Sequence, residues 1–168
     1  IRENIQIRRF TRMEGTLVSY VHGEGRIGVL VKLDTDLGEK AYACGKDCAL
    51  QIAAMNPAYL DRTKVPAEVL ENEKTIMEAQ MREDPKMANK PAAVLSKIVE
   101  GKIGKYYSEN CLVDQEFVKD GDYTVGQYVE KCAKELGGTI KIADYVRYER
   151  GEGIAKKADN FADEVASI

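Results

Sequence analysis

The sequence lacks the features that mark membrane, nucleic-acid-binding and catalytic proteins. No apolar run approaches the ~20 residues of a membrane span, so we expect no membrane partner. The formal charge of −3 argues against the basic face that a nucleic-acid partner requires. The single histidine, His22, has no serine or cysteine at a known catalytic spacing. We therefore expect no catalytic residue and no enzymatic activity.

Cysteine is also sparse, and its spacing matches no zinc module. The chain has Cys44, Cys48, Cys111 and Cys132. The first two share a face of an expected helix and could meet a metal or each other. The spacing favours the alternative, in which the thiols are free and behave as small apolar residues in a reducing compartment. A charged segment stands at residues 2–12 instead of a signal peptide. With the free thiols, this leads us to expect a cytoplasmic protein, and the cysteine spacing leads us to expect no metal; we also expect no cofactor.

Two short apolar runs, over residues 17–21 and 27–31, predict a β-hairpin. Gly23 and Gly25 lie between them and can adopt the positive φ that a tight connection needs. The stretch also fits a loose G-x-G-x-x-G, but a strand follows where a dinucleotide site needs a helix. The segment Gly151-Glu152-Gly153 is likewise interpreted as a bend and not as a phosphate loop.

Alternating apolar and polar residues predict two further strands, over residues 4–13 and 139–148. From Glu39 onward the apolar residues follow helical spacing, and Asn56-Pro57 ends the predicted helix, since proline disfavours helical geometry in the residue before it. These elements alternate in type along the chain, which favours a mixed fold.

A second packing helix is marked by its capping residues. Thr124 and Gln127 have the spacing of a capping box, and Gly137-Gly138 ends the helix. A terminal amphipathic helix is expected from Asp159. Together these patterns predict an α+β fold with an antiparallel sheet of four strands and two packing helices.

Two segments between the strands have high helical character, over residues 66–81 and 91–107. Their apolar stripes are Val69, Leu70, Ile76, Met77 and Met81 in the first and Leu95, Ile98, Val99, Ile103 and Tyr106 in the second. Such a pair predicts an inserted antiparallel helical hairpin, a coiled coil that projects as an interaction arm. Gly101 and Gly104 each cost about 1 kcal/mol against alanine, which indicates either close packing or a weak helix.

The same pattern predicts three units. The core α+β subdomain is discontinuous and consists of residues 1–64 and 109–155. The helical hairpin is inserted over residues 65–108, and residues 156–168 form a C-terminal helix module.

Several short motifs follow one another in a fixed order. They include Glu3-Asn4-Ile5-Gln6-Ile7-Arg8-Arg9, Tyr20-Val21-His22-Gly23, Arg26-Ile27-Gly28-Val29-Leu30, Val65-Pro66-Ala67-Glu68-Val69, Thr124-Val125-Gly126-Gln127 and Gly151-Glu152-Gly153-Ile154. In this order the motifs resemble the bacterial elongation factor Ts family. The resemblance covers nearly the whole chain and implies a C-terminal core subdomain, a coiled-coil dimerisation arm and a C-terminal module.

The resemblance implies a guanine-nucleotide exchange factor that binds elongation factor Tu during translation elongation and promotes GDP release. It implies partner contacts at Ile1, His22, Gly23, Arg26 and Phe161. It also implies a homodimer, whose surface is the hairpin arms, an exposed sheet face or a strand edge.

The family's N-terminal domain and its Thr-Asp-Phe-Val segment, which the family inserts near the magnesium site, are missing from this sequence. We therefore expect a fragment that keeps its partner contacts and exchanges nucleotide poorly. The alternative is a dimerisation module with no exchange activity of its own.

Overall fold

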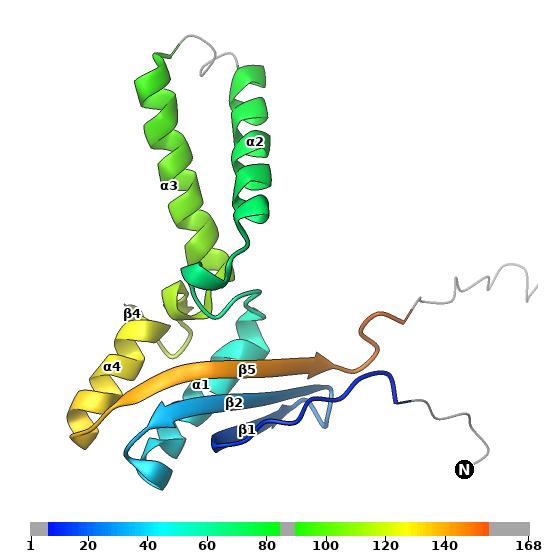
Figure 1. The fold of residues 1–168 in the computed structure, drawn as a ribbon, viewed down its shortest axis with the longest axis vertical. Coiled ribbons are helices and arrows are strands. Elements are labelled where there is room, and N and C mark those ends of the chain that lie inside the picture. Colours follow the sequence, from blue (N-terminus) through cyan, green and yellow to red (C-terminus); the bar gives the residue numbers. More distant parts are fainter. Residues whose placement is uncertain (1–6, 85–89, 155–168) are drawn as a thin grey trace, which may run out of the picture.

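In the computed structural model, which describes residues 7–84 and 90–154, two long helices project side by side from a body built on a β-sheet (Figure 1). The elements in chain order are β1 (Thr16–His22), β2 (Ile27–Thr35), α1 (Tyr42–Met55), α2 (Ala67–Glu83), α3 (Ala92–Asn110), β3 (Glu116–Phe117), β4 (Asp120–Thr124), α4 (Val125–Leu136) and β5 (Ile140–Glu149). The predicted α+β class is confirmed. The expected helix from Asp159 lies outside the described residues.

The main sheet has three antiparallel strands in the order β1-β2-β5. β2 is central, and its residue Ile27 pairs with His22 of β1 and with Glu149 of β5. The register with β5 shifts between Lys32 and Leu33. β3 and β4 form a separate two-stranded sheet, so the prediction of a single four-stranded sheet is wrong.

The segment before β1 does not form the strand that its sequence predicts. We expected a strand over residues 4–13, but residues 7–14 form no strand, and Ile7 and Phe10 are 85% and 82% exposed. Side chains attach this segment to the end of β5 instead: Thr11 Oγ1 lies 2.6 Å from the hydroxyl of Tyr148. Alternation indicated a strand, but a strand also needs a neighbour to pair with, and none of the described strands pairs with residues 7–14.

α1 and α4, the two predicted packing helices, both pack against one face of the main sheet. The core between them includes Val31, Ile52 and Val125, each 0% exposed. The local signals for α4 are confirmed as well, since Thr124 forms the full capping box and Gly137 caps the other end at φ 73°. Capping residues close in sequence determine where α4 begins and ends, and burial of its apolar residues holds it against the sheet.

Two buried glutamines tie α1 to the chain that returns from the arm. Gln51 is 0% exposed; its amide donates to the carbonyl of Glu116 at 3.0 Å and accepts the N–H of Val118 at 2.8 Å. The same amide group donates to the side chain of Gln115, which in turn donates to the carbonyl of Glu109 at the end of α3. This network satisfies polar groups that burial would otherwise leave costly.

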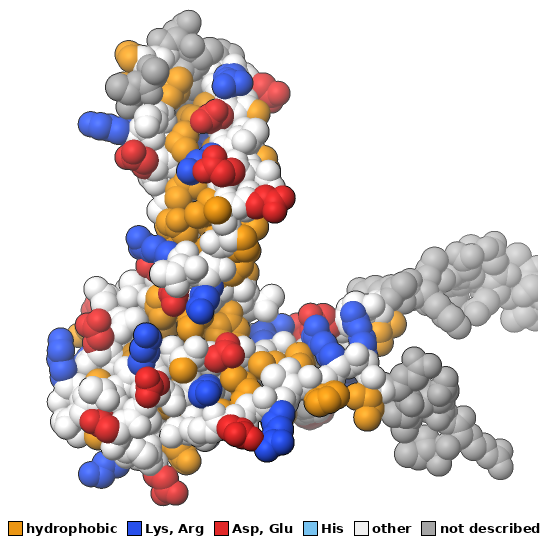
Figure 2. Space-filling view, viewed as in Figure 1, with side chains coloured by type: hydrophobic (Ala, Val, Ile, Leu, Met, Phe, Trp, Pro, Cys, Tyr) orange, Lys and Arg blue, Asp and Glu red, His pale blue; other side chains and the backbone are white. Residues whose placement is uncertain are grey.

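α2 and α3 form the predicted helical hairpin, which we call the arm (Figure 1). Figure 2 shows hydrophobic side chains running along the arm between charged ones. Met81 is 5% exposed, but Ile76 is 49% exposed, so its assignment to the buried stripe is wrong. A Cβ at Gly101 or Gly104 would meet nothing within 4 Å, so close packing does not explain these glycines. They weaken the helix.

At the foot of the arm, Arg62 forms an ion pair with Asp114 at 2.7 Å and lies 5.0 Å from the ring centre of Tyr107. These contacts join the two ends of the insertion.

Within residues 7–84 and 90–154, no helix combines the length and the apolar composition needed to cross a membrane.

Candidate partner-binding site

The turn between β1 and β2, residues 23–26, brings three of the predicted partner-binding residues together. Gly23, Glu24 and Gly25 have φ values of 57°, 54° and 85°. The N–H of Arg26 closes the turn by donating to the carbonyls of His22 and Gly23, both at 3.0 Å. Glycine adopts this left-handed backbone at low cost, which is why the sequence places it there. The turn therefore holds His22 and Arg26 on a short, closed loop.

His22 is an exposed residue whose ring is held from within its own strand. Its Nδ1 lies 3.0 Å from the hydroxyl of Tyr20, and the two ring centres are 6.0 Å apart. Tyr20 in turn packs against the hydrophobic core. The contact occupies Nδ1, and Nε2 has no hydrogen-bond partner in the described part of the chain. The imidazole is thus oriented by the core, with one nitrogen available to a partner.

The end of β5 lies directly beside the turn. The N–H of Arg150 donates to the carbonyl of Arg26 at 2.8 Å, and Arg26 Nε lies 3.6 Å from a carboxylate oxygen of Glu149. Such an exposed pair stabilises by at most about 1 kcal/mol. Its effect is to aim the guanidinium of Arg26, which keeps 66% of its side chain exposed.

A second turn, at residues 150–153, borders the first and confirms the interpretation of Gly151-Glu152-Gly153 as a bend. The backbone N–H of Glu149 and the nearby Arg9 lower the pKa of Glu152 below its usual value. Arg8 donates to the Glu152 carbonyl and Arg9 pairs with its carboxylate. The segment before β1 is thereby held at the same end of the sheet.

The structure thus brings His22, Gly23 and Arg26 together, and their contact with a partner stays a prediction. Tyr20 was missed although it lies two residues before His22 on the same predicted strand, a spacing that places both on one face. Glu149 and Glu152 were missed because nothing in the local pattern shows that β5 ends beside a turn more than a hundred residues earlier. The pairing of Ile27 with Glu149 could have been found only from the strand register. Ile1 and Phe161, also predicted contacts, lie outside the described residues.

The cysteines do not add a reactive group to this site. Cys44, Cys48 and Cys111 are buried, and all four thiols are free. Burial raises the pKa of both Cys111 and Cys132 to about 11, and a protonated thiol is a poor nucleophile and metal ligand. Among residues 7–84 and 90–154, no three His, Cys, Asp or Glu side chains are placed to hold a metal ion. What the turn offers is recognition by hydrogen bonding and charge.

Comparison with known proteins shows which family the chain belongs to. A family profile described as "Elongation factor TS" matches residues 1–152, which include the turn and the whole arm. The chain belongs to the elongation factor Ts family. The resemblance inferred from its motifs is therefore confirmed.

Individual members of the elongation factor Ts family agree over almost all of this chain. Elongation factor Ts of Clostridium acetobutylicum is 48% identical over 167 residues, covering 97% of this chain and 53% of the relative. Elongation factor Ts of Clostridium tetani is 46% identical, covering 97% of this chain and 54% of the relative. The chain thus spans about half the length of these curated relatives.

Proposed function

We propose that this chain is the part of a guanine-nucleotide exchange factor that recognises elongation factor Tu, and that the turn at residues 23–26 is a contact. Membership of the elongation factor Ts family, matched over residues 1–152, carries the proposal. The exposed Arg26 and the oriented His22 support the location, because both sit on a paired hairpin and lose little freedom on binding. Ile1, Gly23 and Phe161 remain predicted contacts of the same partner.

Exchange of this kind makes and breaks no covalent bond. The factor and the nucleotide bind the same GTPase, and each lowers the affinity of the other by the same factor. We expect residues 1–168, tested by themselves without a Thr-Asp-Phe-Val segment, to bind elongation factor Tu while releasing GDP slowly. A cytoplasmic location is part of this proposal.

The test is a titration of the chain into elongation factor Tu loaded with fluorescent GDP, with complex formation and GDP release followed in the same sample. Binding with slow release supports the proposal. Failure to bind at micromolar concentrations would contradict it. Release as fast as that given by a complete family member would show that the Thr-Asp-Phe-Val segment is dispensable.

The contribution of the turn is tested by His22→Ala, with Leu136→Ala as the matched control. Leu136 is 40% exposed and lies at the far end of α4. We expect His22→Ala to weaken binding about 5- to 30-fold, a loss of about 1–2 kcal/mol, because interface anchors contribute at this level. Equal affinities for the two variants would place the contact elsewhere.

A second candidate function, self-association, is favoured by the open face of the main sheet. Opposite α1 and α4, a hollow of about 230 Å³ is lined by residues that include Val21, Leu30, Val146 and Tyr148. Val21 is 67% exposed, and an apolar sheet face of this kind suits a second copy of the chain. Sedimentation equilibrium of Val21→Glu against Leu136→Glu tests it: a dimer lost only in Val21→Glu supports this face, whereas a monomeric wild type excludes it.

A further inference from the structure

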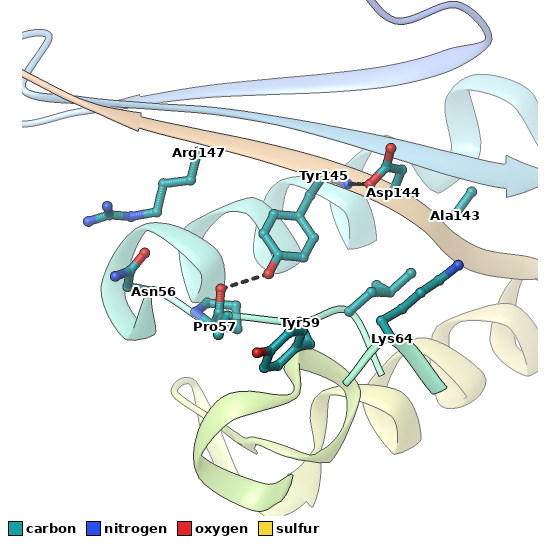
Figure 3. Close-up of a pocket in the computed structure, with 10 residues that line it drawn as sticks. Asn56, Pro57, Tyr59, Lys64, Ala143, Asp144, Tyr145 and Arg147 are labelled. Atoms are coloured by element: carbon teal, nitrogen blue, oxygen red, sulfur yellow. Dashed lines mark hydrogen bonds between the residues drawn. The ribbon is translucent and has the colours of Figure 1, made fainter. Parts of the chain in front are cut away.

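A hollow of about 500 Å³ lies between β5 and the loop that follows α1 (Figure 3). Its polar lining includes Asn56, Lys64 and Arg147, and its walls include Pro57, Tyr59 and Tyr145. In Figure 3, Arg147 and Lys64 stand on opposite sides of Tyr145. The hollow thus has a cationic group at each end and aromatic rings between them.

Arg147 has hydrogen-bonding capacity that the described residues leave unused. Its side chain is only 12% exposed, and its Nη2 donates to Glu149 at 2.9 Å. Its Nε is buried without any partner, which is uncommon for a charged donor in a folded protein. Glu149 also faces Arg26, so one carboxylate serves two guanidinium groups. Arg147 therefore shares its counter-ion with Arg26 and has one N–H without a partner among the described residues.

Lys64 and Asn56 add further donors. Lys64 is exposed and forms no ion pair or side-chain hydrogen bond with the described residues, although its charge helps to lower the pKa of nearby Asp61. The side chain of Asn56 is likewise unpaired in the described part of the chain. Asp144 is the acidic residue of the lining, and its carboxylate accepts the N–H of Tyr145 at 2.8 Å. The lining thus contains two cationic side chains, Lys64 and Arg147, and one carboxylate, Asp144.

The wall of the hollow is fixed. The hydroxyl of Tyr145 donates to the carbonyl of Pro57 at 2.7 Å, and burial raises the pKa of this tyrosine to about 12. It therefore keeps its proton, and this hydrogen bond, at neutral pH. Asn56 is held in the left-handed conformation that ends α1, with φ 46°. A ligand would meet a preformed surface.

We propose that this hollow binds the carboxylates of an acidic, extended segment of a protein partner. The guanidinium of Arg147 suits a carboxylate because its planar donors can bond both oxygens, and Lys64 supplies a second charge at the other end. An extended chain can reach both ends, and its neighbouring atoms can pack on Tyr59 and Tyr145. This inference does not depend on the proposed recognition of elongation factor Tu, because the hollow is lined by none of the predicted contacts, although Glu149 pairs with both Arg26 and Arg147.

The competing explanation is that Arg147 is purely structural. The carbonyl groups at the C-terminal end of α1 carry partial negative charge and attract a cation without any ligand. The two explanations differ in one respect: a structural arginine gives no response to acidic peptide.

An NMR titration of the intact chain with acetylated, amidated tetraglutamate, and in parallel with the tetraglutamine peptide, decides between them. We expect saturable shifts of the amides of Asn56, Tyr59, Lys64 and Arg147 with tetraglutamate only, weakening as salt is added. The absence of shifts, shifts confined to other surfaces, or equal shifts with tetraglutamine would overturn the inference.

Variants sharpen the titration. Lys64→Gln should weaken tetraglutamate binding about 2- to 5-fold, as expected for an exposed ion pair. Lys97→Gln, an exposed lysine on the arm, is the control and should leave it unchanged. Arg147→Gln should abolish tetraglutamate binding. If Arg147→Gln does not fold, Lys64→Gln still tests the site. Equal weakening by Lys64→Gln and Lys97→Gln would mean non-specific attraction, which contradicts the site.

Discussion

The body and the arm of this protein are held together by different means. In the body, Val31, Ile52 and Val125 are 0% exposed and come from three elements far apart in the sequence. In the arm, Met81 is the buried residue of α2, while Ile76 is 49% exposed. The arm has ion pairs within one helix instead, such as Lys74 with Glu71.

The difference follows from geometry. Two helices that project from the body can bury one narrow stripe each, whereas helices laid on a sheet bury a whole face. We infer that tertiary burial stabilises the body and that local helix energetics and a thin seam stabilise the arm. The candidate partner-binding residues His22 and Arg26 belong to the better-stabilised region.

The largest expected effect compares two isoleucines. Ile52→Ala should lower the free energy of unfolding by about 2–5 kcal/mol, because it leaves a cavity in a closed core. Ile76→Ala should change it by less than about 0.5 kcal/mol, because half of the side chain is already in water. Urea unfolding measures both, and similar losses in the two variants would remove the distinction between body and arm.

The second comparison uses two glutamines. Gln51→Leu leaves the N–H of Val118 and the carbonyl of Glu116 without their partner and should cost about 1–3 kcal/mol for each unpaired group. Gln80→Leu, at an exposed residue of α2 that forms no side-chain hydrogen bond with the described residues, should be nearly neutral. Chemical denaturation of the pair checks this, and a neutral Gln51→Leu would mean that water replaces the network.

The third comparison predicts effects of opposite sign. A Cβ at Gly45 would lie 2.7 Å from Val18 Cγ2 and 2.9 Å from Leu33 Cδ1. This overpacking should cost about 1–3 kcal/mol of stability in Gly45→Ala, against a gain in helix propensity of about 1 kcal/mol. Gly101→Ala meets nothing and should keep that gain. Circular dichroism should show a lower Tm for Gly45→Ala and more helix for Gly101→Ala. A lower helix content in Gly101→Ala would mean that the arm has a partner at this position.

The smallest effect concerns acid. The N–H and hydroxyl of Thr139 hold the pKa of Asp36, in the body, below its ordinary value of 3.8. The contribution of a depressed carboxyl is present above the unfolded value and is lost as the pH falls through the folded one. Stability should therefore decline below about pH 4, and less steeply in Asp36→Asn. Thermal unfolding from pH 5 to pH 2 measures the slopes; identical slopes would exclude Asp36 from the acid response.

Much of this arrangement could be predicted from the sequence, because the signals were local. The capping box of Thr124 and Gln127, the turn glycines and the paired helical stripes each depend on residues a few positions apart. The strand expected over residues 4–13 failed because pairing depends on a neighbour that alternation does not reveal. The hollow at Arg147 was not found, since β5 and the loop after α1 meet only through the fold.

Native-state hydrogen exchange tests the distinction between body and arm most directly. The account predicts that amides of β2 and α1 exchange only through global unfolding, with the full unfolding free energy, whereas amides of α2 and α3 exchange through local opening at a clearly lower free energy. One common exchange free energy for the strands of the body and the helices of the arm would contradict it.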